Sequence, residues 1–466
     1  MNSAIGDGLA IKSERKDSPF LPASITKKIP ATAAFQKSRQ PQEPNQQLRI
    51  LAINFENMEE RTNRVLVIWI LGALATVSPF AIDLYLPAFT QIASDFGTTP
   101  SQISLSVSSY FVGMALGQIL YGPLLDRFGR KRPLYAGLLI FILASAGCAQ
   151  SQNVDSLVIL RFAQALGGSV AWVAAVAMVR DFFPVQESAR IFSLLILILG
   201  VSPLLAPTFG GFIATEFTWE AIFYVLAVIG AMILVVSYLF LPARYRPDPN
   251  ISLKPGPIIK TFLWVLRDPL FYTYTFAGAF SFATLFIYVA GSPIIFMQIF
   301  NVSPQAYGGI FALLSVSFIG GSQLNVFLTR KFSSEKLFSF ALTCQVVISF
   351  IFLLGVWAGL LGLYSTVVMF FLLLGCLGIC NPNANALALA GFTRNIGSAS
   401  ALLGCTQIGV AALASSGVGL FDTSDILPIV ALMAGTAAVA LLIVFVGKRN
   451  ITSPIPANPS AGQIVH

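Results

Sequence analysis

The chain has 466 residues, of which 56% are hydrophobic and only 10% are charged. Soluble domains usually carry roughly 25% charged residues, so this composition excludes a soluble globular protein. The net charge of +8 indicates nucleic acid as a partner only if the basic residues form one patch. They are instead spread over short loops between hydrophobic runs, so we expect the lipid bilayer as a partner and no nucleic acid.

The first 60 residues differ from the rest because they are polar and contain five prolines and charges of both signs. Such a composition is typical of disordered segments, and we predict a disordered cytoplasmic tail over residues 1–60. Glu14, Asp17 and Glu43 argue against an organelle transit peptide, and no apolar core marks a signal peptide. An alternative is that translation begins at Met58, which the intact mass of the natively expressed protein would decide.

Twelve hydrophobic runs follow, and each is long enough for a bilayer-spanning helix, which needs roughly 20 mostly apolar residues. They cover residues 65–89, 103–125, 133–150, 157–179, 191–214, 219–241, 270–296, 307–328, 337–357, 364–390, 397–420 and 426–446. Lys and Arg occur in the tails and in alternate loops, whereas the intervening loops carry only acidic charges, at Asp95, Asp155, Glu216, Asp422 and Asp425. Because cytoplasmic loops are enriched in Lys and Arg, the sequence predicts an all-α polytopic membrane protein with both termini in the cytoplasm.

Two ionisable side chains other than Tyr and Cys lie inside these spans, away from their ends: Asp83 in the first and Arg161 in the fourth. A charge near the bilayer centre costs roughly 2.5–3.5 kcal/mol. Both lie in the outer half at similar depth, so we expect them to interact directly or through Gln164, one helical turn on. We interpret Asp83 as a proton carrier whose proton affinity changes as Arg161 moves, and the alternative is a static pair that fixes helix packing. Pro87 leaves the Asp83 carbonyl without its helical donor and predicts a kink there.

The loop after the second span is a short, highly charged turn with Asp126 at a helix end among four cations. We expect it to hold neighbouring helices together on the cytoplasmic side in one transport state, and plain anchoring by positive charge is the alternative. The residues predicted to take part in this gating are Gly122, Asp126, Arg127, Gly129 and Arg130. Residues 122–132 resemble the Gly-x-x-x-Asp-Arg-x-Gly-Arg-Arg signature of the major facilitator superfamily, with Lys131 in place of the last Arg.

Three further runs resemble this family. Residues 161–167 resemble its Arg-x-x-Gln-x-x-Gly, and residues 207–211 resemble its Pro-x-x-Gly-Gly, which is associated with antiporters. Pro207 bends the fifth span because it cannot donate a backbone hydrogen bond, while Gly210 and Gly211 allow tight helix packing that could block a leak path. We therefore count these three residues among those that take part in conformational gating. Residues 78–88 resemble the opening of the Bcr/CflA branch of drug:proton antiporters, with its Asp-x-Tyr-x-Pro core. The resemblance implies a protein of the bacterial inner membrane.

A basic, proline-rich segment at residues 243–268 divides the twelve spans into six and six. We predict a cytoplasmic linker there, between an N-terminal six-helix bundle at 61–242 and a C-terminal one at 269–447, with a cytoplasmic tail at 448–466. Two equal halves indicate an internal duplication whose bundles rock about a central substrate site. The resemblance implies the same architecture, the major facilitator fold.

Several polar and aromatic residues inside the spans are candidates for lining a substrate cavity. They are Tyr85, Gln164, Tyr288, Asn381, Asn383 and Gln407. A buried amide needs a partner or a cavity, so a cavity-lining role and a helix-to-helix hydrogen bond are equally good interpretations of Asn383. A large apolar cavity suits amphipathic drugs.

The resemblance implies a proton-coupled secondary transporter that exports small amphipathic drugs or antibiotics by drug:proton antiport. Export of an endogenous metabolite or siderophore is the alternative. The Pro-x-x-Gly-Gly match argues against an importer, and short external loops argue against a non-transporting scaffold or receptor. The chain has no phosphate-binding loop and its single histidine is His466, so we predict neither an enzyme nor an ATP-driven pump. Cys376 and Cys380 lack further ligands nearby, so we expect no metal. We also expect no cofactor, the proton as the coupling ion, and a monomer.

Overall fold

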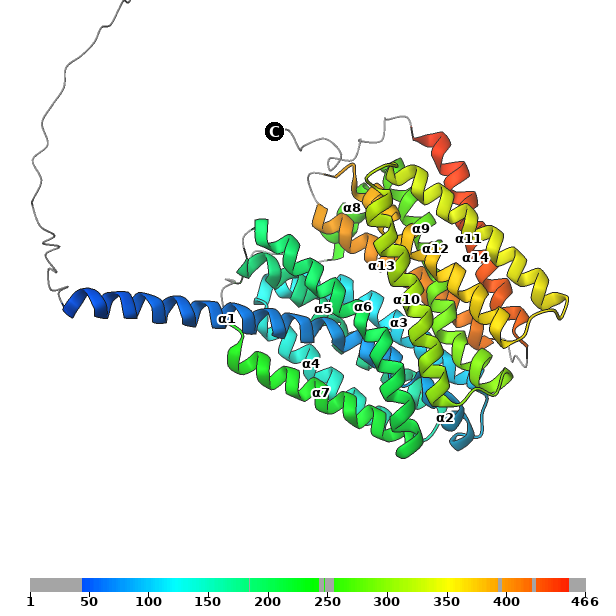
Figure 1. Ribbon diagram of the computed structural model, residues 1–466, viewed down its shortest axis with the longest axis horizontal. Coiled ribbons are helices and arrows are strands. Elements are labelled where there is room, and N and C mark those ends of the chain that lie inside the picture. Colours follow the sequence, from blue (N-terminus) through cyan, green and yellow to red (C-terminus); the bar gives the residue numbers. More distant parts are fainter. Residues whose placement is uncertain are drawn as a thin grey trace, which may run out of the picture. The chain divides into compact units, whose positions relative to one another are not determined.

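The computed structural model describes residues 44–183, 185–242, 247, 255–392, 396–420 and 425–451, and every element in these ranges is a helix (Figure 1). Residues 1–43 of the predicted N-terminal tail, most of the 243–254 stretch of the predicted linker, and residues 452–466 of the predicted C-terminal tail lie outside the described residues. So does Asp422, one of the acidic charges used to orient the spans.

The first half of the chain contains seven α-helices and one short 3₁₀ turn within the described residues. They are α1 (Pro44–Asp83), η1 (Leu86–Ala88), α2 (Phe89–Asp95), α3 (Pro100–Phe128), α4 (Lys131–Cys148), α5 (Val154–Phe182), α6 (Val185–Glu216) and α7 (Trp219–Phe240). Helix α1 begins at Pro44, inside the segment predicted to be disordered, and proline suits the first turn of a helix because its missing N–H has no partner there in any case. This part of the 1–60 prediction therefore differs from the structure.

The second half repeats the pattern after a short helix in the predicted linker. Its elements are α8 (Pro255–Val265), α9 (Pro269–Pro293), η2 (Ile294–Ile299), α10 (Pro304–Leu328), α11 (Ser334–Trp357), α12 (Leu363–Leu389), α13 (Ile396–Leu420), α14 (Leu427–Gly447) and η3 (Lys448–Asn450). Twelve of the described helical segments are long and apolar enough to cross a membrane, the first being Arg64–Asp95. The predicted all-α polytopic fold class is confirmed.

Helix starts follow from local sequence. The side chain of Asp268 accepts a hydrogen bond from the backbone of Phe271, and Ser303 accepts one from Ala306. Each of these caps precedes a proline at the first helical position, Pro269 or Pro304. A polar cap followed by proline satisfies the free N–H groups of the first turn, which sets where α9 and α10 begin.

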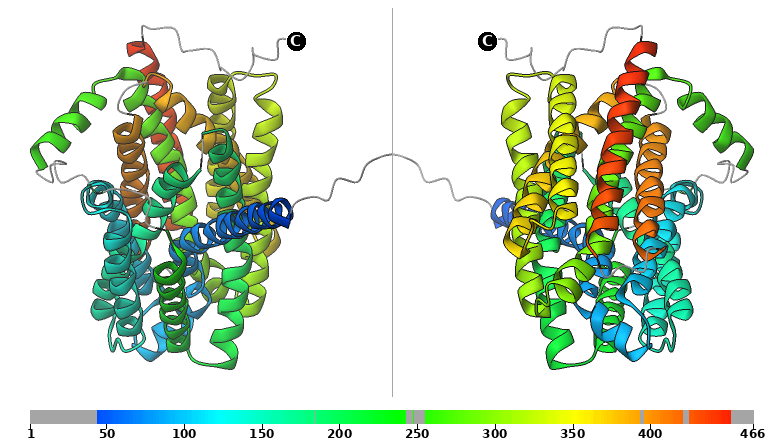
Figure 2. Two further views of the ribbon diagram at one scale, coloured as in Figure 1. Left: turned by 90° about the vertical axis from the view of Figure 1, so that its left-hand side faces the viewer. Right: turned by 90° about the vertical axis from the view of Figure 1, so that its right-hand side faces the viewer.

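The helices of each half pack mainly with one another: α5 with α3 and α4, and α9 with α12, α13 and α14. The most extensive contacts between the halves are those of α3 with α13 and of α6 with α10. Figure 2 shows the first pair, with orange α13 beside the cyan helix α3. The helix ends near residues 127–132 are called the basic end below, and those near Asp95, Asp155 and Glu216 the acidic end.

Hydrogen bonds join the halves close to the acidic end. Ser108 of α3 and Ser415 of α13 share a hydrogen bond of 2.9 Å between their hydroxyl oxygens. Gln305 of α10 donates to the hydroxyl of Thr215 in α6 at 2.5 Å. Both helix pairs therefore hold the halves together in the outer half of the predicted membrane region.

Candidate transport site

Asp83 is the last residue of α1. The backbone N–H of Leu84 still bonds to Phe80, but the chain then leaves the helix and resumes as the 3₁₀ turn η1, which contains Pro87. Because Pro87 has no N–H, the carbonyl of Asp83 has no helical donor four residues on. The break predicted beside the single carboxylate of this span is confirmed, and the Asp83 side chain is buried, with 6% of its surface exposed.

Arg161 of α5 is fully buried and is held by three neighbouring helices. Its Nη1 donates to the carbonyl of Ala81 at 2.9 Å and to Oε1 of Gln164 at 2.5 Å. The amide of Gln164 in turn donates to the hydroxyl of Ser145 in α4 at 2.7 Å. Gln164 therefore positions the guanidinium, as its place on the same helical face predicts.

Two tyrosine rings lie against the guanidinium. The Cζ atom of Arg161 is 4.3 Å from the ring centre of Tyr85 and 4.3 Å from that of Tyr110 in α3. Tyr85 is itself fixed by a 2.9 Å hydrogen bond between its hydroxyl and that of Ser106. Tyr85, predicted to line the cavity, is instead part of the packing around Arg161.

No ion pair joins Asp83 to Arg161 among the described residues, so the expected direct pair is absent from this conformation. Arg161 binds the backbone of Ala81, two residues before Asp83, rather than the carboxylate. The bond of Arg161 to Ala81 agrees with the similar depth that the sequence predicts for the two residues, but the break in α1 brings the Tyr85 ring against the guanidinium. The Nε and Nη2 atoms of Arg161 are buried and have no hydrogen-bond partner within the part of the chain that is described.

The Asp83 carboxyl lies within electrostatic range of three tyrosine hydroxyls, those of Tyr110 in α3, Tyr288 in α9 and Tyr307 in α10. Two of these belong to the second half of the chain. Tyr288 is only 1% exposed and stacks on Phe311, with ring centres 5.4 Å apart. Its ring is therefore packed against other aromatic rings of the second half and does not line an open cavity here.

The asparagines of α12 have two different roles. Asn383 is buried and donates to Oδ1 of Asn325 in α10 at 2.6 Å and to the carbonyl of Ile379 at 2.8 Å. Of the two interpretations left open for Asn383, the structure supports the helix-to-helix hydrogen bond. Asn325 follows Gly321 by four residues, as Asp126 follows Gly122, so it occupies the place of the acidic residue in the second half.

Asn381, Asn385 and Gln407 form a separate group of amides between α12 and α13. Gln407 donates to Asn385 at 2.7 Å and to Asn381 at 3.3 Å. Asn381 and Asn385 are half-buried, and Gln407 is 8% exposed. Of the predicted cavity residues, Asn381 and Gln407 therefore lie together with polar groups partly accessible, and Asn385 joins them.

We predict that Asn383→Ala lowers the stability of the protein by about 1–2 kcal/mol, since it removes an interhelical hydrogen bond and leaves Asn325 without its donor. The melting temperature of the purified protein in detergent measures this. Asn385→Ala is the matched control, because that side chain bonds only within the half-buried amide group. A variant of Asn383 that keeps its melting temperature and changes the range of exported compounds would favour the cavity role instead.

The predicted gating loop forms an ionic bridge inside the first half. Arg130 donates from Nη1 to Asp126 at 2.5 Å and from Nε to Asp181, at the end of α5, at 2.7 Å. Burial opposes the charge of Arg130, but the hydrogen bonds to Asp181 and Asp126 outweigh it and raise the pKa of the guanidinium above its ordinary value. The loop is thus tied to α5 through Asp181, which was not among the predicted site residues.

The other residues of the loop have different surroundings. Gly129 has a φ of +82°, a backbone conformation that favours glycine. The guanidinium of Arg127 lies 5.8 Å from the ring centre of Phe128. A side chain at Gly122 would meet nothing within 4 Å, so the structure gives this glycine no packing role in the present conformation.

The Pro-x-x-Gly-Gly run of α6 touches two different partners. A side chain at Gly210 would collide with the backbone carbonyl of Leu84, the residue after Asp83. A methyl group at Gly211 would lie 2.6 Å from the carbonyl oxygen of Pro304, at the start of α10. Adjacent glycines therefore pack on the break in α1 and on the opposite half of the molecule, which is the tight packing that the two glycines predicted.

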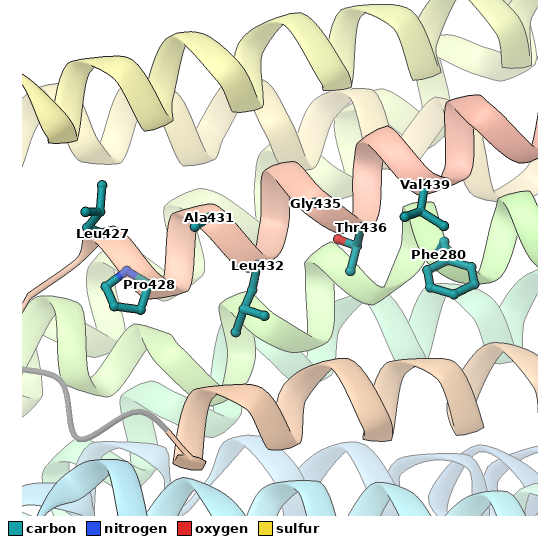
Figure 3. Close-up of a pocket in the computed structure, with 8 residues that line it drawn as sticks. All are labelled: Phe280, Leu427, Pro428, Ala431, Leu432, Gly435, Thr436 and Val439. Atoms are coloured by element: carbon teal, nitrogen blue, oxygen red, sulfur yellow. The ribbon is translucent and has the colours of Figure 1, made fainter.

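A groove of about 520 Å³ runs along α14 and is shown in Figure 3. It is lined by Phe280 of α9 and by seven residues of α14 between Leu427 and Val439. Its single polar side chain is that of Thr436. None of the predicted cavity residues lines it, so this groove is separate from the site around Asp83.

Taken together, twelve spanning helices in two equal sets, with a buried carboxyl and a buried guanidinium within the first set, define a polytopic membrane transporter. The chain belongs to the Major Facilitator Superfamily, whose sequence profile matches residues 71–416. This confirms the family that the loop signature indicated. The members are transporters rather than enzymes, as predicted.

Relatives and solved structures agree with this assignment. The chain is 29% identical to a bicyclomycin resistance protein homolog of Haemophilus influenzae, over 85% of this chain and 100% of the relative. It is 32% identical to the MFS-type transporter YdgK of Bacillus subtilis (82% and 95%) and 28% identical to the multidrug resistance protein MdtL of a Shewanella species (79% and 92%). These similarities confirm the Bcr/CflA branch that residues 78–88 indicated.

The fold is shared with more distant proteins of known structure. A bacterial homolog of the human lysosomal transporter Spinster superposes with a TM-score of 0.65 at 15% identity, covering 83% of this chain and 97% of the other. A D-xylose-proton symporter gives a TM-score of 0.66 at 14% identity, covering 82% and 97%. The major facilitator fold is therefore confirmed by structure as well as by sequence.

Proposed function

We propose that this chain exports small amphipathic drugs or antibiotics from the cytoplasm by exchanging them for protons. The observation that carries the proposal is Asp83, a buried carboxyl with no ionic partner in the described part of the chain, at a helix break on which a glycine of the antiporter motif packs. The names of the relatives, which include bicyclomycin resistance and multidrug resistance proteins, support drugs as the class of cargo.

Asp83 is the proton carrier in this proposal. A buried carboxylate without a counter-charge is costly, whereas its protonated form can be buried at far less expense. Proton release therefore requires that the carboxyl reach water or a cation. Arg161, whose Nε and Nη2 have no hydrogen-bond partner among the residues that the structure describes, supplies that cation when the helices rearrange.

The movement that exposes Asp83 is a separation of the two halves at the acidic end. The packing of Gly210 on Leu84 and of Gly211 on Pro304 links that movement to the chain break that bears Asp83. The charge pattern of the loops puts the acidic end outside and both termini in the cytoplasm. Protons then enter from the outside as cargo leaves, with the monomer as the working unit and no cofactor.

Cargo is held by the half-buried amides of Asn381 and Asn385 and the adjoining amide of Gln407, together with aromatic side chains near the centre. Such a mixture of a few polar groups and a large apolar surface suits amphipathic molecules. Exchange of one proton for one neutral molecule moves one charge, which is worth about 2.3 kcal/mol per 100 mV. Since a tenfold gradient costs about 1.4 kcal/mol, this sustains a concentration ratio of several tens.

A drug-susceptibility panel in an efflux-deficient bacterial host tests the proposal, followed by proton measurements in inverted membrane vesicles. We expect raised resistance to at least one amphipathic compound, and release of protons from the vesicle lumen when that compound is added. If no compound is exported and none produces a proton signal, drug:proton antiport is excluded. An endogenous metabolite or siderophore would then be the cargo to test.

A further inference from the structure

We infer that Tyr85 and Tyr110 are positioning residues of the proton-coupling site, which clamp the guanidinium of Arg161 between their rings and keep it away from the carboxyl of Asp83 while that carboxyl holds a proton. The inference deepens the proposed function and rests on Asp83 as the proton carrier. Neither tyrosine needs to touch the proton or the cargo to act in this way.

The clamp is built from three separate parts of the fold. Tyr85 lies just after the break in α1, Tyr110 lies in α3, and Arg161 lies in α5. All three side chains are fully buried, and both ring centres are 4.3 Å from Cζ. A cation against the face of an aromatic ring is attracted by the ring electrons, and more strongly where water is excluded. The two rings therefore stabilise the positive charge of Arg161, which forms no ion pair with a carboxylate among the described residues.

The hydrogen bonds of Arg161 fix one edge of the guanidinium and leave the other unused. Nη1 is bound by Ala81 and Gln164, while Nε and Nη2 have no partner among the described residues. Two parallel N–H groups on one edge match the two oxygens of a carboxylate. Asp83 follows Ala81 by two residues, so the carboxyl belongs to the same chain segment that Arg161 already binds through its backbone.

Other titratable groups surround the site, but they are neutral near pH 7. Tyr110 of α3, Tyr288 of α9 and Tyr307 of α10 are within electrostatic range of Asp83, and Cys148 of α4 is within range of Tyr85 and Tyr110. Tyrosine and cysteine are uncharged at that pH under ordinary conditions. The position of Arg161 therefore decides how firmly Asp83 holds its proton.

Opening the clamp has a definite consequence for Asp83. A cation within reach favours the ionised form of a carboxyl and lowers the pH at which it binds a proton, typically by about 1–3 units. A variant that removes one ring should free Arg161 to approach Asp83. A variant that keeps the ring and loses only the hydroxyl should not.

The experiment measures the protonation of Asp83 directly, without transport. Dicyclohexylcarbodiimide reacts with protonated carboxyls in apolar surroundings, and mass spectrometry of the full-length protein in liposomes gives the extent of Asp83 labelling at each pH. We expect the labelling midpoint of Tyr110→Leu to fall by about one pH unit or more, and that of Tyr110→Phe to match the unmodified protein. Tyr121→Leu, a buried tyrosine of the same helix away from Arg161, is the control and should also match.

Two results would overturn the clamp. One is an unchanged midpoint in Tyr110→Leu, and the other is an equal shift in Tyr110→Phe, which would assign the effect to the hydroxyl. If Tyr110→Leu does not fold, Tyr85→Leu makes the same test from the other ring, and an unchanged midpoint in that variant would overturn the clamp. A different result would contradict the proposed function, namely an Asp83→Asn variant that still couples export to protons, whatever the labelling midpoints are.

Discussion

Replacing Gly210 by alanine is expected to stop transport almost completely. The new methyl group would overlap the backbone carbonyl of Leu84, and a backbone atom cannot turn aside as a flexible side chain can. Overpacking of this kind typically costs about 1–3 kcal/mol, and about 1.4 kcal/mol corresponds to a tenfold change. Because Leu84 follows Asp83 directly, the strain falls on the chain break that holds the proton carrier, so we expect at least about a tenfold loss of efflux rate.

Efflux of a fluorescent amphipathic compound from vesicles measures this loss, with the melting temperature as a check on folding. Gly200→Ala is the matched control in the same helix, since its nearest neighbour is the flexible tip of Ile319 at 3.6 Å. We expect that control to transport at close to the rate of the unmodified protein. Equal rates for Gly210→Ala and Gly200→Ala would show that contact with the break in α1 has no part in the cycle.

The twelve spans were predictable from sequence because an apolar run of sufficient length has few alternatives in a membrane. The ends of the spanning helices were less predictable. The second span was predicted at 103–125, whereas α3 covers Pro100–Phe128, since polar residues at both ends extend the helix beyond its hydrophobic part. The start of helix α1 was missed for a similar reason, because its first turns are polar and their composition predicted a disordered tail.

The candidate site was predicted in position but not in contacts. Counting residues gives depth along a helix, at about 1.5 Å per residue, and this placed Asp83 and Arg161 at similar levels. It says nothing of which side chain fills the space between them. Tyr110 is one of 12 tyrosines in an aromatic-rich chain and lies in no motif, so its place against Arg161 required the fold.

Asn383 could have been predicted more sharply. The second half keeps the spacing of the loop signature at Gly321 and Asn325, which indicates that Asn325 stands where the first half has Asp126. In the first half Arg130 bridges Asp126 to Asp181 of α5. In the second half a direct bond between Asn325 and Asn383 joins α10 to α12. The duplication therefore preserves a link between corresponding helices while its chemistry changes from ionic to neutral.

The other large effect is expected for Asp83→Asn, which should abolish proton-coupled export while leaving the protein folded. The amide keeps the size of the carboxyl and has no proton to release, so the halves can no longer exchange one bound proton for one molecule of cargo. No ion pair with Arg161 is lost in this conformation, and a neutral side chain is less costly to bury than an unpaired carboxylate. We therefore expect a melting temperature no lower than that of the unmodified protein.

Cargo accumulation and proton release in inverted vesicles under an imposed pH gradient distinguish the carrier role from a structural one. Asp155→Asn, a change at an exposed residue of the acidic end, is the control and should keep both signals. Loss of both signals with preserved melting and preserved binding of cargo assigns the proton to Asp83. If Asp83→Asn is expressed normally and still exports against a gradient with proton release, the carrier lies elsewhere. Since Asp83 and Arg161 are the two charged residues deep within the described spans, the coupling would then have to pass through a neutral group such as Tyr288 or Tyr307, or through bound water.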